Sequence, residues 1–171
     1  MSTLLRGDRS IRAELTRDAI KEVRRLNRVI ERTERRISRA LEESGTTLHT
    51  TVGIGAMLAA KILGEVGDPA QLRSAAGFAR LSGVAPIPAS SGNIVRHRHD
   101  RRGNRTLNNA IHMIAVVRCR LDVATKAYVA KKRSEGKTGK EAMRCLKRHI
   151  ANDIYRRMRS DCRTEEGDLT I

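Results

Sequence analysis

Two adjacent serines, Ser90 and Ser91, stand directly before a glycine and a dense run of basic side chains. From residue 89 the chain reads ASSGNIVRHRHDRRGNRTLN, and the ten residues from 96 to 105 include five arginines and two histidines. A serine hydroxyl can attack a phosphodiester if it loses its proton and if the charge developing on the phosphoryl oxygens is neutralised. The spacing therefore predicts a hydroxyl nucleophile beside a cluster of candidate phosphate ligands: Arg96, Arg98, Arg101, Arg102 and Arg105.

The other polar residues of this stretch have candidate roles in the same chemistry. His97 or His99 could transfer a proton, and Asn104 could bind nucleic acid or cap a following helix. The simpler interpretations are a turn hydroxyl for the serines, surface side chains for the histidines and a general nucleic-acid patch for the arginines. The residue types alone leave both sets of interpretations open.

The net charge favours a polyanionic partner. Lys and Arg number 35 against 19 Asp and Glu, which gives a net charge of +16 and a pI near 11.1. Clustered basic side chains gain affinity for DNA or RNA by releasing counterions from the phosphates. Aromatic residues make up only 2% of the chain, which argues against the base-stacking surfaces of single-strand binders. We therefore expect DNA as a partner, bound mainly through its phosphates.

The composition argues against membrane, disulfide-rich and metal-dependent classes. No apolar run approaches the ~20 residues that span a bilayer, and the first residues lack the apolar region of a signal peptide, so we expect a cytoplasmic protein with no membrane partner. Cys119, Cys145 and Cys162 are odd in number and widely spaced, which predicts reduced thiols rather than disulfides or a zinc site. No acid cluster or nucleotide-binding glycine loop stands out, so no metal or cofactor is expected in this chain.

The pattern of elements predicts a mainly α protein with four or five helices and no convincing strand. Residues 10–44 contain no Gly or Pro, and their apolar and small side chains follow the a and d spacing of a coiled coil. These side chains are Val23, Leu26, Ile30, Thr33, Ile37 and Ala40. We expect a long helix that makes a homo-oligomer through residues 11–41; one amphipathic helix lying on its own domain is the alternative.

The stretch TVGIGAMLAAKILGEVGD, which starts at residue 51, has the pattern of a helix-hairpin-helix over about residues 48–66. Gly53 and Gly55 permit a tight turn, and the amides at the start of the following helix, expected over 56–66, can hold a phosphate. In the alternative interpretation the glycines only let two helices pack closely. The core residues would then be Ile54, Leu58, Ala59 and Leu63.

Glycine and proline mark the entry into the serine loop. A short apolar helix should end at Gly83, and Pro86 and Pro88 should keep the following chain extended. Residues 89–105 are therefore predicted to form an exposed loop rather than part of a helix or strand.

Two further helices are expected after this loop. The first runs from Asn104 to about Arg133, and the second opens with Thr138 and Glu141 at the T-x-x-E spacing of a capping box. The chain from Asp161 is expected to be disordered.

Three regions follow from these elements. Residues 1–46 form a helical arm, residues 47–160 form a compact helical domain, and residues 161–171 form a tail. Because the helices supply the core, we expect the function in the loops of the domain.

Four segments, in this order, carry a family resemblance: VGIGAMLAAKILGEVGD, FARLSGVAPIPASSGN, RHRHDRRGNRTLNNAIHMIA and AYVAKKRSEGKTGKEAMRCLKRHIANDIY. Together they resemble the C-terminal region of transposases of the insertion sequence 110/116/902 family, over about Leu48 to Arg157. The ordered set is specific, because P-x-x-x-x-S-G is followed by R-H-R, G-N-R and R-C-L-K-R-H. The preceding helix is similar to the coiled-coil connector of this family.

The resemblance implies a recombinase that cuts and rejoins DNA through a serine nucleophile, guided by a structured RNA that the element encodes. Ser91 matches the family's serine, since it stands directly before Gly92 and five residues after Pro86; Ser90 is the second choice. The family also has an N-terminal RuvC-like domain with DEDD metal-binding acids, which is missing from this sequence. We therefore expect Mg²⁺ only together with that domain, and no strand transfer by this chain alone.

Two other functions remain open. A non-catalytic dimeric module would bind DNA or RNA through the hairpin and the basic loop, without cleavage. A tyrosine recombinase would instead use Tyr155 as its nucleophile. Tyr155 has several basic neighbours in the sequence: Arg148, His149, Arg156 and Arg157. However, it falls on the expected apolar flank of its helix, and these arginines are more simply interpreted as solvated side chains.

Overall fold

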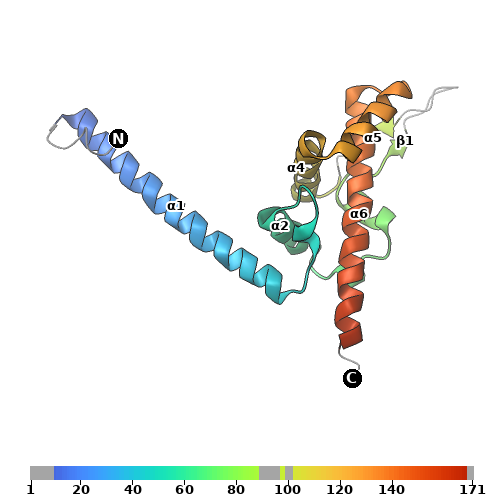
Figure 1. Cartoon of the computed structure of the whole chain (residues 1–171), viewed down its shortest axis with the longest axis horizontal. Coiled ribbons are helices and arrows are strands. Elements are labelled where there is room, and N and C mark those ends of the chain that lie inside the picture. Colours follow the sequence, from blue (N-terminus) through green and yellow to red (C-terminus); the bar gives the residue numbers. More distant parts are fainter. Residues whose placement is uncertain (1–9, 89–96, 99–101, 169–171) are drawn as a thin grey trace. The chain divides into compact units, whose positions relative to one another are not determined.

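The chain is mainly α-helical in the computed structural model, which describes residues 10–88, 97–98 and 102–168 (Figure 1). The predicted fold class is therefore confirmed. The chain divides into two compact units, Met1–Ala40 and Leu41–Ile171.

The described part of the first unit is one helix. α1 spans Ile11–Glu43, and Ser10 starts it by accepting a hydrogen bond from the Ala13 amide (3.2 Å). Ion pairs between side chains three residues apart support the helix surface: Lys21 with Asp18 at 2.9 Å and Arg25 with Glu22 at 2.8 Å. The predicted single helix over residues 11–41 is confirmed.

α1 carries an apolar stripe that is open to solvent. Val23, Leu26 and Ile30, three of the predicted coiled-coil positions, are 56%, 44% and 52% exposed. Self-association through this stripe stays a prediction.

The second unit is a helical domain built around its last helix, α6 (Gly139–Asp168). The other helices are α2 (Ala56–Val66), α3 (Ala75–Leu81), α4 (Arg105–Leu121) and α5 (Val123–Ser134), with 3₁₀ turns η1 (Leu48–Thr50) and η2 (Pro69–Gln71). α6 runs the length of this unit and contacts α3, α4, α5 and both 3₁₀ turns (Figure 1). The predicted capping box starts α6: the Glu141 carboxylate accepts a bond from the Thr138 amide (2.9 Å), and the Thr138 hydroxyl accepts one from the Glu141 amide (3.3 Å).

The core of the second unit forms where the apolar stripe of α6 meets the other helices. The buried residues of this stripe are Ala142, Leu146, Ile150, Ile154 and Met158. Those of α4 are Leu107, Ala110, Ile111, Ile114 and Ala115. On α2, Ala59 and Ile62 are fully buried, whereas Leu58 and Leu63 remain partly exposed, so the predicted core of this helix is only partly right.

The predicted single helix over residues 104–133 is wrong, because Asp122 divides it into α4 and α5. The Asp122 carboxylate accepts hydrogen bonds from the amides of Ala124 (3.3 Å) and Thr125 (3.0 Å), so it caps a new helix. The Thr125 hydroxyl also donates to this carboxylate and is the main cause of the lowered pKa of Asp122. A strong helix-starting residue thus outweighs the continuous helical pattern around it.

The expected disorder from Asp161 is wrong for residues 161–168, which continue α6. The Asp161 carboxylate accepts hydrogen bonds from the Thr47 amide (2.9 Å), the Thr47 hydroxyl (2.6 Å) and the Thr46 hydroxyl (3.2 Å). These bonds tie the last part of α6 to the chain that enters η1. They join residues 114 or 115 positions apart, a distance over which no local sequence pattern operates.

A short strand pair forms where no strand was expected. β1 (Ile87–Pro88) pairs antiparallel with β2 (His97–Arg98), with Ile87 opposite Arg98 and Pro88 opposite His97. Two residues are too few to show the alternation that identifies strands in a sequence. Pro88 has no N–H to donate, which a short strand at an edge tolerates.

Candidate nucleic-acid interface

The predicted nucleophile and part of its phosphate clamp lie outside the described residues. These residues are Ser91, the second choice Ser90, Arg96, His99 and Arg101. His97 and Arg98 are described as the backbone of β2. The structure therefore defines the elements that flank the serine loop.

Two contacts hold the flanks of this loop together. The β1–β2 pair places Pro88 opposite His97, so residues 89–96 begin and end at paired backbone positions. Beyond the pair, Gly103 packs on Gly83: a Cβ on Gly103 would lie 2.2 Å from the Cα and from the N of Gly83. Only glycine fits at position 103, and Gly83 has a φ of 64°, which also favours glycine.

Asn104 is engaged by the protein itself. Its backbone amide donates to the Leu81 carbonyl (2.6 Å), and its side-chain oxygen accepts a bond from the Leu107 amide (3.0 Å), which caps α4. Its side-chain nitrogen donates to the Glu65 carboxylate on α2. The predicted cap is confirmed, and contact of Asn104 with nucleic acid stays a prediction.

Asn108 connects three helices beside this junction. Its side-chain nitrogen donates to the carbonyls of Ser82 (3.0 Å) and Gly83 (3.1 Å), at the end of α3, and its oxygen accepts a bond from Lys147 Nζ on α6 (2.6 Å). Lys147 is only 8% exposed, and this burial lowers the pKa of its ammonium group. A buried basic group is thus part of the support of the Gly83 turn.

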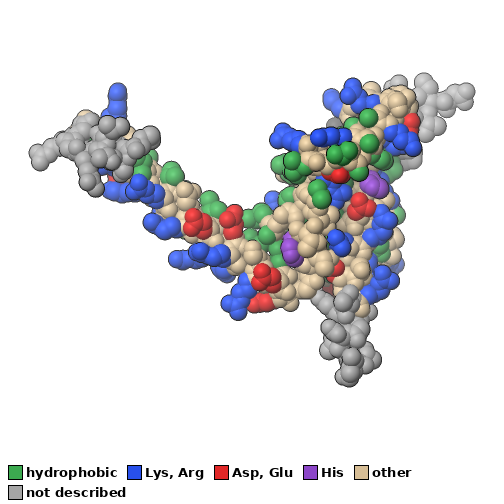
Figure 2. All heavy atoms as spheres, viewed as in Figure 1, with side chains coloured by type: hydrophobic (Ala, Val, Ile, Leu, Met, Phe, Trp, Pro, Cys, Tyr) green, Lys and Arg blue, Asp and Glu red, His purple; other side chains and the backbone are tan. Residues whose placement is uncertain are grey.

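The described cations of the predicted clamp are on the surface. The side chains of Arg102 and Arg105 are exposed, Arg105 in the first turn of α4. Figure 2 shows Lys and Arg side chains over much of the visible surface, with Asp and Glu scattered among them. This distribution of charge suits a ligand with many phosphates.

In the glycine turn before α2, Gly53 packs closely against α4, whereas Gly55 has open space beside it. Gly53 has a φ of 81°, and a Cβ there would lie 3.2 Å from Arg118 Cγ and 3.4 Å from the Ile114 carbonyl oxygen. Gly55 is the N-cap residue of α2, and a Cβ there would meet no described atom within 4 Å. Because the element before this turn is the 3₁₀ turn η1, the helix-hairpin-helix and its phosphate contact stay predictions.

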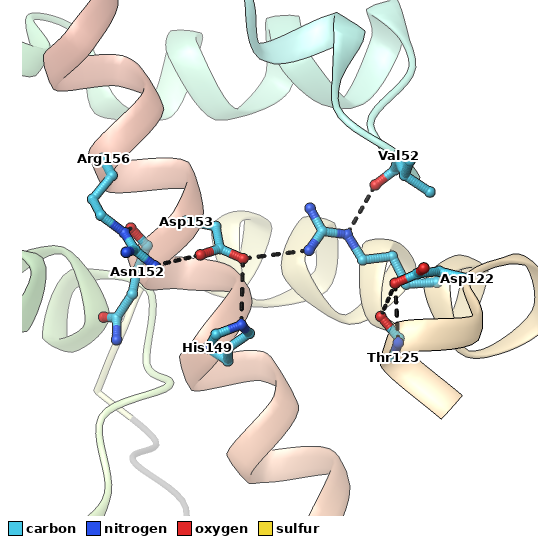
Figure 3. Close-up of polar contacts among 8 residues, drawn as sticks. Val52, Asp122, Thr125, His149, Asn152, Asp153 and Arg156 are labelled. Carbon is cyan, nitrogen blue, oxygen red and sulfur yellow. Dashed lines mark hydrogen bonds and ion pairs between the residues drawn. The ribbon is translucent and has the colours of Figure 1, made fainter. Parts of the chain in front are cut away.

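Arg118 is a buried arginine that the sequence reasoning did not select as a site residue. Its Nε donates to the Val52 carbonyl (2.9 Å), and one Nη lies 3.5 Å from the Asp153 carboxylate. The Asp153 carboxylate also lies 2.6 Å from Arg156 Nη2 and 3.7 Å from His149 Nε2. Figure 3 shows both side chains facing Asp153. The signal that could have identified Arg118 is its place on the apolar stripe of α4, where a charged side chain needs a buried partner.

Tyr155 contributes to packing. Its hydroxyl donates to the Leu72 carbonyl (3.3 Å), between η2 and α3. The neighbouring Arg148 donates to the Ala75 carbonyl (3.4 Å), so the interpretation of this arginine as simply solvated is wrong. Both side chains attach α6 to the chain around α3.

The described ranges contain neither a cluster of metal ligands nor a membrane-spanning helix. Among residues 10–88, 97–98 and 102–168, no group of three or more His, Cys, Asp or Glu side chains is placed to hold a metal ion. None of the helices in the described part of the chain is both long and apolar enough to cross a bilayer.

Residues 45–130 match the family model described as Transposase IS116/IS110/IS902 family. The chain belongs to this family. The match includes the glycine turn before α2, the serine loop and Arg118, whereas Lys147 lies beyond it. The transposase region therefore contains both flanks of the loop.

Three relatives are proteins of insertion elements. The chain is 35% identical over 109 residues to the uncharacterized 42 kDa protein of IS900 from Mycobacterium paratuberculosis, and 33% identical over 108 residues to the uncharacterized 43.6 kDa protein of IS110 from Streptomyces coelicolor. It is 27% identical over 119 residues to the uncharacterized 44.8 kDa protein of IS116 from Streptomyces clavuligerus. These matches cover 63–69% of this chain and 27–30% of the relatives, so the chain spans less than a third of their length.

Proposed function

We propose that residues 47–160 form the nucleic-acid-binding, serine-bearing part of a DNA recombinase, with Ser91 as the nucleophile. The observation that carries the proposal is the pairing of both flanks of the serine loop, within a region that matches a transposase family. A nucleophile needs a defined position relative to the bond that it attacks. The strand pair and the Gly83–Gly103 contact supply a fixed base for such positioning.

The proposed chemistry is a reversible transesterification. The Ser91 hydroxyl gives up its proton and bonds to phosphorus, while the bond from phosphorus to one strand oxygen breaks and that oxygen takes up a proton. His97 or His99 carries the proton, and rejoining reverses the step. The arginines of the loop stabilise the charge on the phosphoryl oxygens: Arg96, Arg98, Arg101, Arg102 and Arg105.

The complete reaction needs two further components in this proposal. A RuvC-like acidic domain would hold Mg²⁺, which would neutralise charge at the phosphate, and a structured guide RNA would select the DNA site. The family resemblance assigns the metal ligands to that domain. The chain's own residues bind phosphates and present the hydroxyl.

The test is adduct formation in a system reconstituted with the acidic domain and the guide RNA. Ser91→Ala should abolish the covalent protein–DNA adduct and change DNA affinity by no more than about fivefold, since a neutral hydroxyl contributes on the order of 1 kcal/mol as a hydrogen-bonding group. Ser90→Ala and Tyr155→Phe are the matched controls and should retain the adduct. Adducts lost only in Ser90→Ala would move the nucleophile by one residue, and adducts lost only in Tyr155→Phe would overturn the serine mechanism.

A non-catalytic dimeric DNA- or RNA-binding module is the second candidate, favoured by the exposed apolar stripe of α1. It predicts binding that weakens steeply with salt and no adduct in the reconstituted system. Replacing Arg101 and Arg105 by Gln should lower the slope of log affinity against log salt by about one unit for each lost phosphate contact. Two duplexes of equal length and unrelated sequence should bind alike, because phosphate contacts do not read the bases.

A further inference from the structure

A pocket of about 200 Å³ lies beside the glycine turn, bounded by η1, α4 and α6. Its apolar walls are Leu48, Ile54 and Ile154, which are at most 2% exposed. Four polar side chains share the lining with them: Thr51, Arg118, Asp153 and Arg157. The pocket thus combines rigid apolar walls with two guanidinium groups.

Thr51 provides an unpaired hydroxyl in this lining. Its Oγ1 is shielded from solvent and has no hydrogen-bond partner among the described residues. A buried hydroxyl without a partner costs free energy, and native proteins almost always supply one. Because water does not reach this oxygen, an oxygen of a ligand in the pocket does not reach it either; the hydroxyl costs free energy without contributing a ligand contact.

Arg118 is held in place with much of its donor capacity still unused. Its Nε bonds to the Val52 carbonyl at 2.9 Å, and only one Nη approaches Asp153, at 3.5 Å (Figure 3). A guanidinium has five N–H donors, and these two contacts occupy two of them. The side chain of Arg118 is 10% exposed, so it is already desolvated and oriented.

The charge balance of the lining favours an anion. The negative charge of Asp153 is taken up mainly by Arg156, at 2.6 Å, which is not part of the lining. Arg157 is exposed and has no ion pair within the described ranges. Two arginines therefore share the lining with a single carboxylate that is already paired.

We propose that this pocket binds one phosphate-type oxyanion through Arg118 and Arg157. Planar guanidinium groups match the paired oxygens of a phosphate. The chain continues from Thr51 through Gly53 and Gly55 into the open N-terminus of α2, where a phosphate backbone could extend. We assign the oxyanion to a nucleic-acid backbone. This assignment rests on the proposed function, whereas the oxyanion chemistry rests on the lining of the pocket.

The first arm of the test uses inorganic phosphate and the full chain. Melting temperature is measured against phosphate concentration, with chloride at equal ionic strength as the reference. Thr51→Val should raise the melting temperature in chloride, because it removes an unpaired buried hydroxyl, and should leave phosphate binding unchanged, because that hydroxyl does not reach the ligand. Arg157→Gln should weaken phosphate binding about tenfold, whereas Arg133→Gln, an equal loss of charge on exposed α5, should leave it unchanged.

The second arm measures duplex DNA affinity of the same four proteins at fixed salt. Weaker binding by Arg157→Gln than by Thr51→Val and Arg133→Gln, with competition by inorganic phosphate, supports the pocket and its nucleic-acid source. If the variants differ in phosphate binding alone, the pocket stands and a nucleic-acid source is rejected. Equal responses of all four proteins to phosphate would overturn the pocket. Absence of duplex binding by the unmodified chain would instead count against the proposed function.

Discussion

Among single residues, Gly103 lies where no side chain fits. A methyl group at this position would lie 2.2 Å from two backbone atoms of Gly83, which cannot move aside as a flexible side chain would. Gly103→Ala should therefore lower the free energy of unfolding by about 2–3 kcal/mol or more, the range of overpacked cores. Chemical denaturation measures the change.

Gly64→Ala is the control for this substitution. Gly64 lies within α2, and a Cβ there would meet no described atom within 4 Å. Because alanine favours helix over glycine, this variant should gain up to about 1 kcal/mol. Equal stabilities of Gly103→Ala and the unmodified chain would contradict the close approach of the two glycines.

Lys147 should make the stability of the second unit depend on alkaline pH. Burial lowers its pKa in the folded protein, so between that lowered pKa and its ordinary value of 10.5 the unfolded chain binds more protons than the folded one. The free energy of unfolding should therefore rise as pH increases through this window. The Lys147→Met variant should lose this rise, as measured by denaturant unfolding from neutral pH to about pH 10.

Lys140→Met provides the comparison, because Lys140 is exposed on the same helix. It should keep the alkaline rise of the unmodified chain. If the free energy of unfolding rose equally steeply with pH in Lys147→Met and Lys140→Met, burial of the Lys147 ammonium group would not be the cause of the rise.

At the scale of elements, local sequence signals were sufficient to predict where several helices begin or end. The bounds of α2 and the capping box of α6 follow from residues within a few positions of each other, Gly55 and the Thr138–Glu141 pair. Asp122 is also a local signal, but the helical pattern on both sides concealed it. The β1–β2 pair has no local signal, because two residues per strand show no periodicity.

The sequence predicts where the candidate site lies along the chain, but it does not predict most of the contacts that hold the ends of the serine loop. The serine loop is visible in the sequence as cations beside Ser91, but its frame depends on contacts between distant residues. Asn108 and Lys147 meet across 39 positions, and Arg118 reaches Val52 across 66. Such pairs are set by how helices pack, which a single sequence does not reveal.

Asp161 offers an element-scale prediction about the end of α6. Asp161→Ala removes the acceptor of three hydrogen bonds from Thr46 and Thr47, so the unfolding free energy should fall by about 1–3 kcal/mol. Amide hydrogen exchange of residues 159–168 should become faster in this variant. Arg163→Ala, at an exposed position of the same helix, should change neither quantity appreciably.

For the molecule as a whole, the open question is whether α1 joins two copies of the chain. Changing Leu26 and Ile30 to Glu places charge in the exposed apolar stripe, so a dimer at ~50 µM should become a monomer in sedimentation experiments. Changing Arg28 to Glu, on the same exposed helix, should leave association intact. A chain that is already monomeric at this concentration would favour a single amphipathic helix.

The central position of α6 also has a consequence for how the protein is made. α6 contacts α3, α4, α5 and both 3₁₀ turns, yet a ribosome synthesises it after all of them. At ~5–20 residues per second, its 30 residues take on the order of seconds to translate. Until then the buried faces of α3 and α4 lack the helix that packs on them, so the nascent chain should depend on chaperones until α6 has emerged from the ribosome.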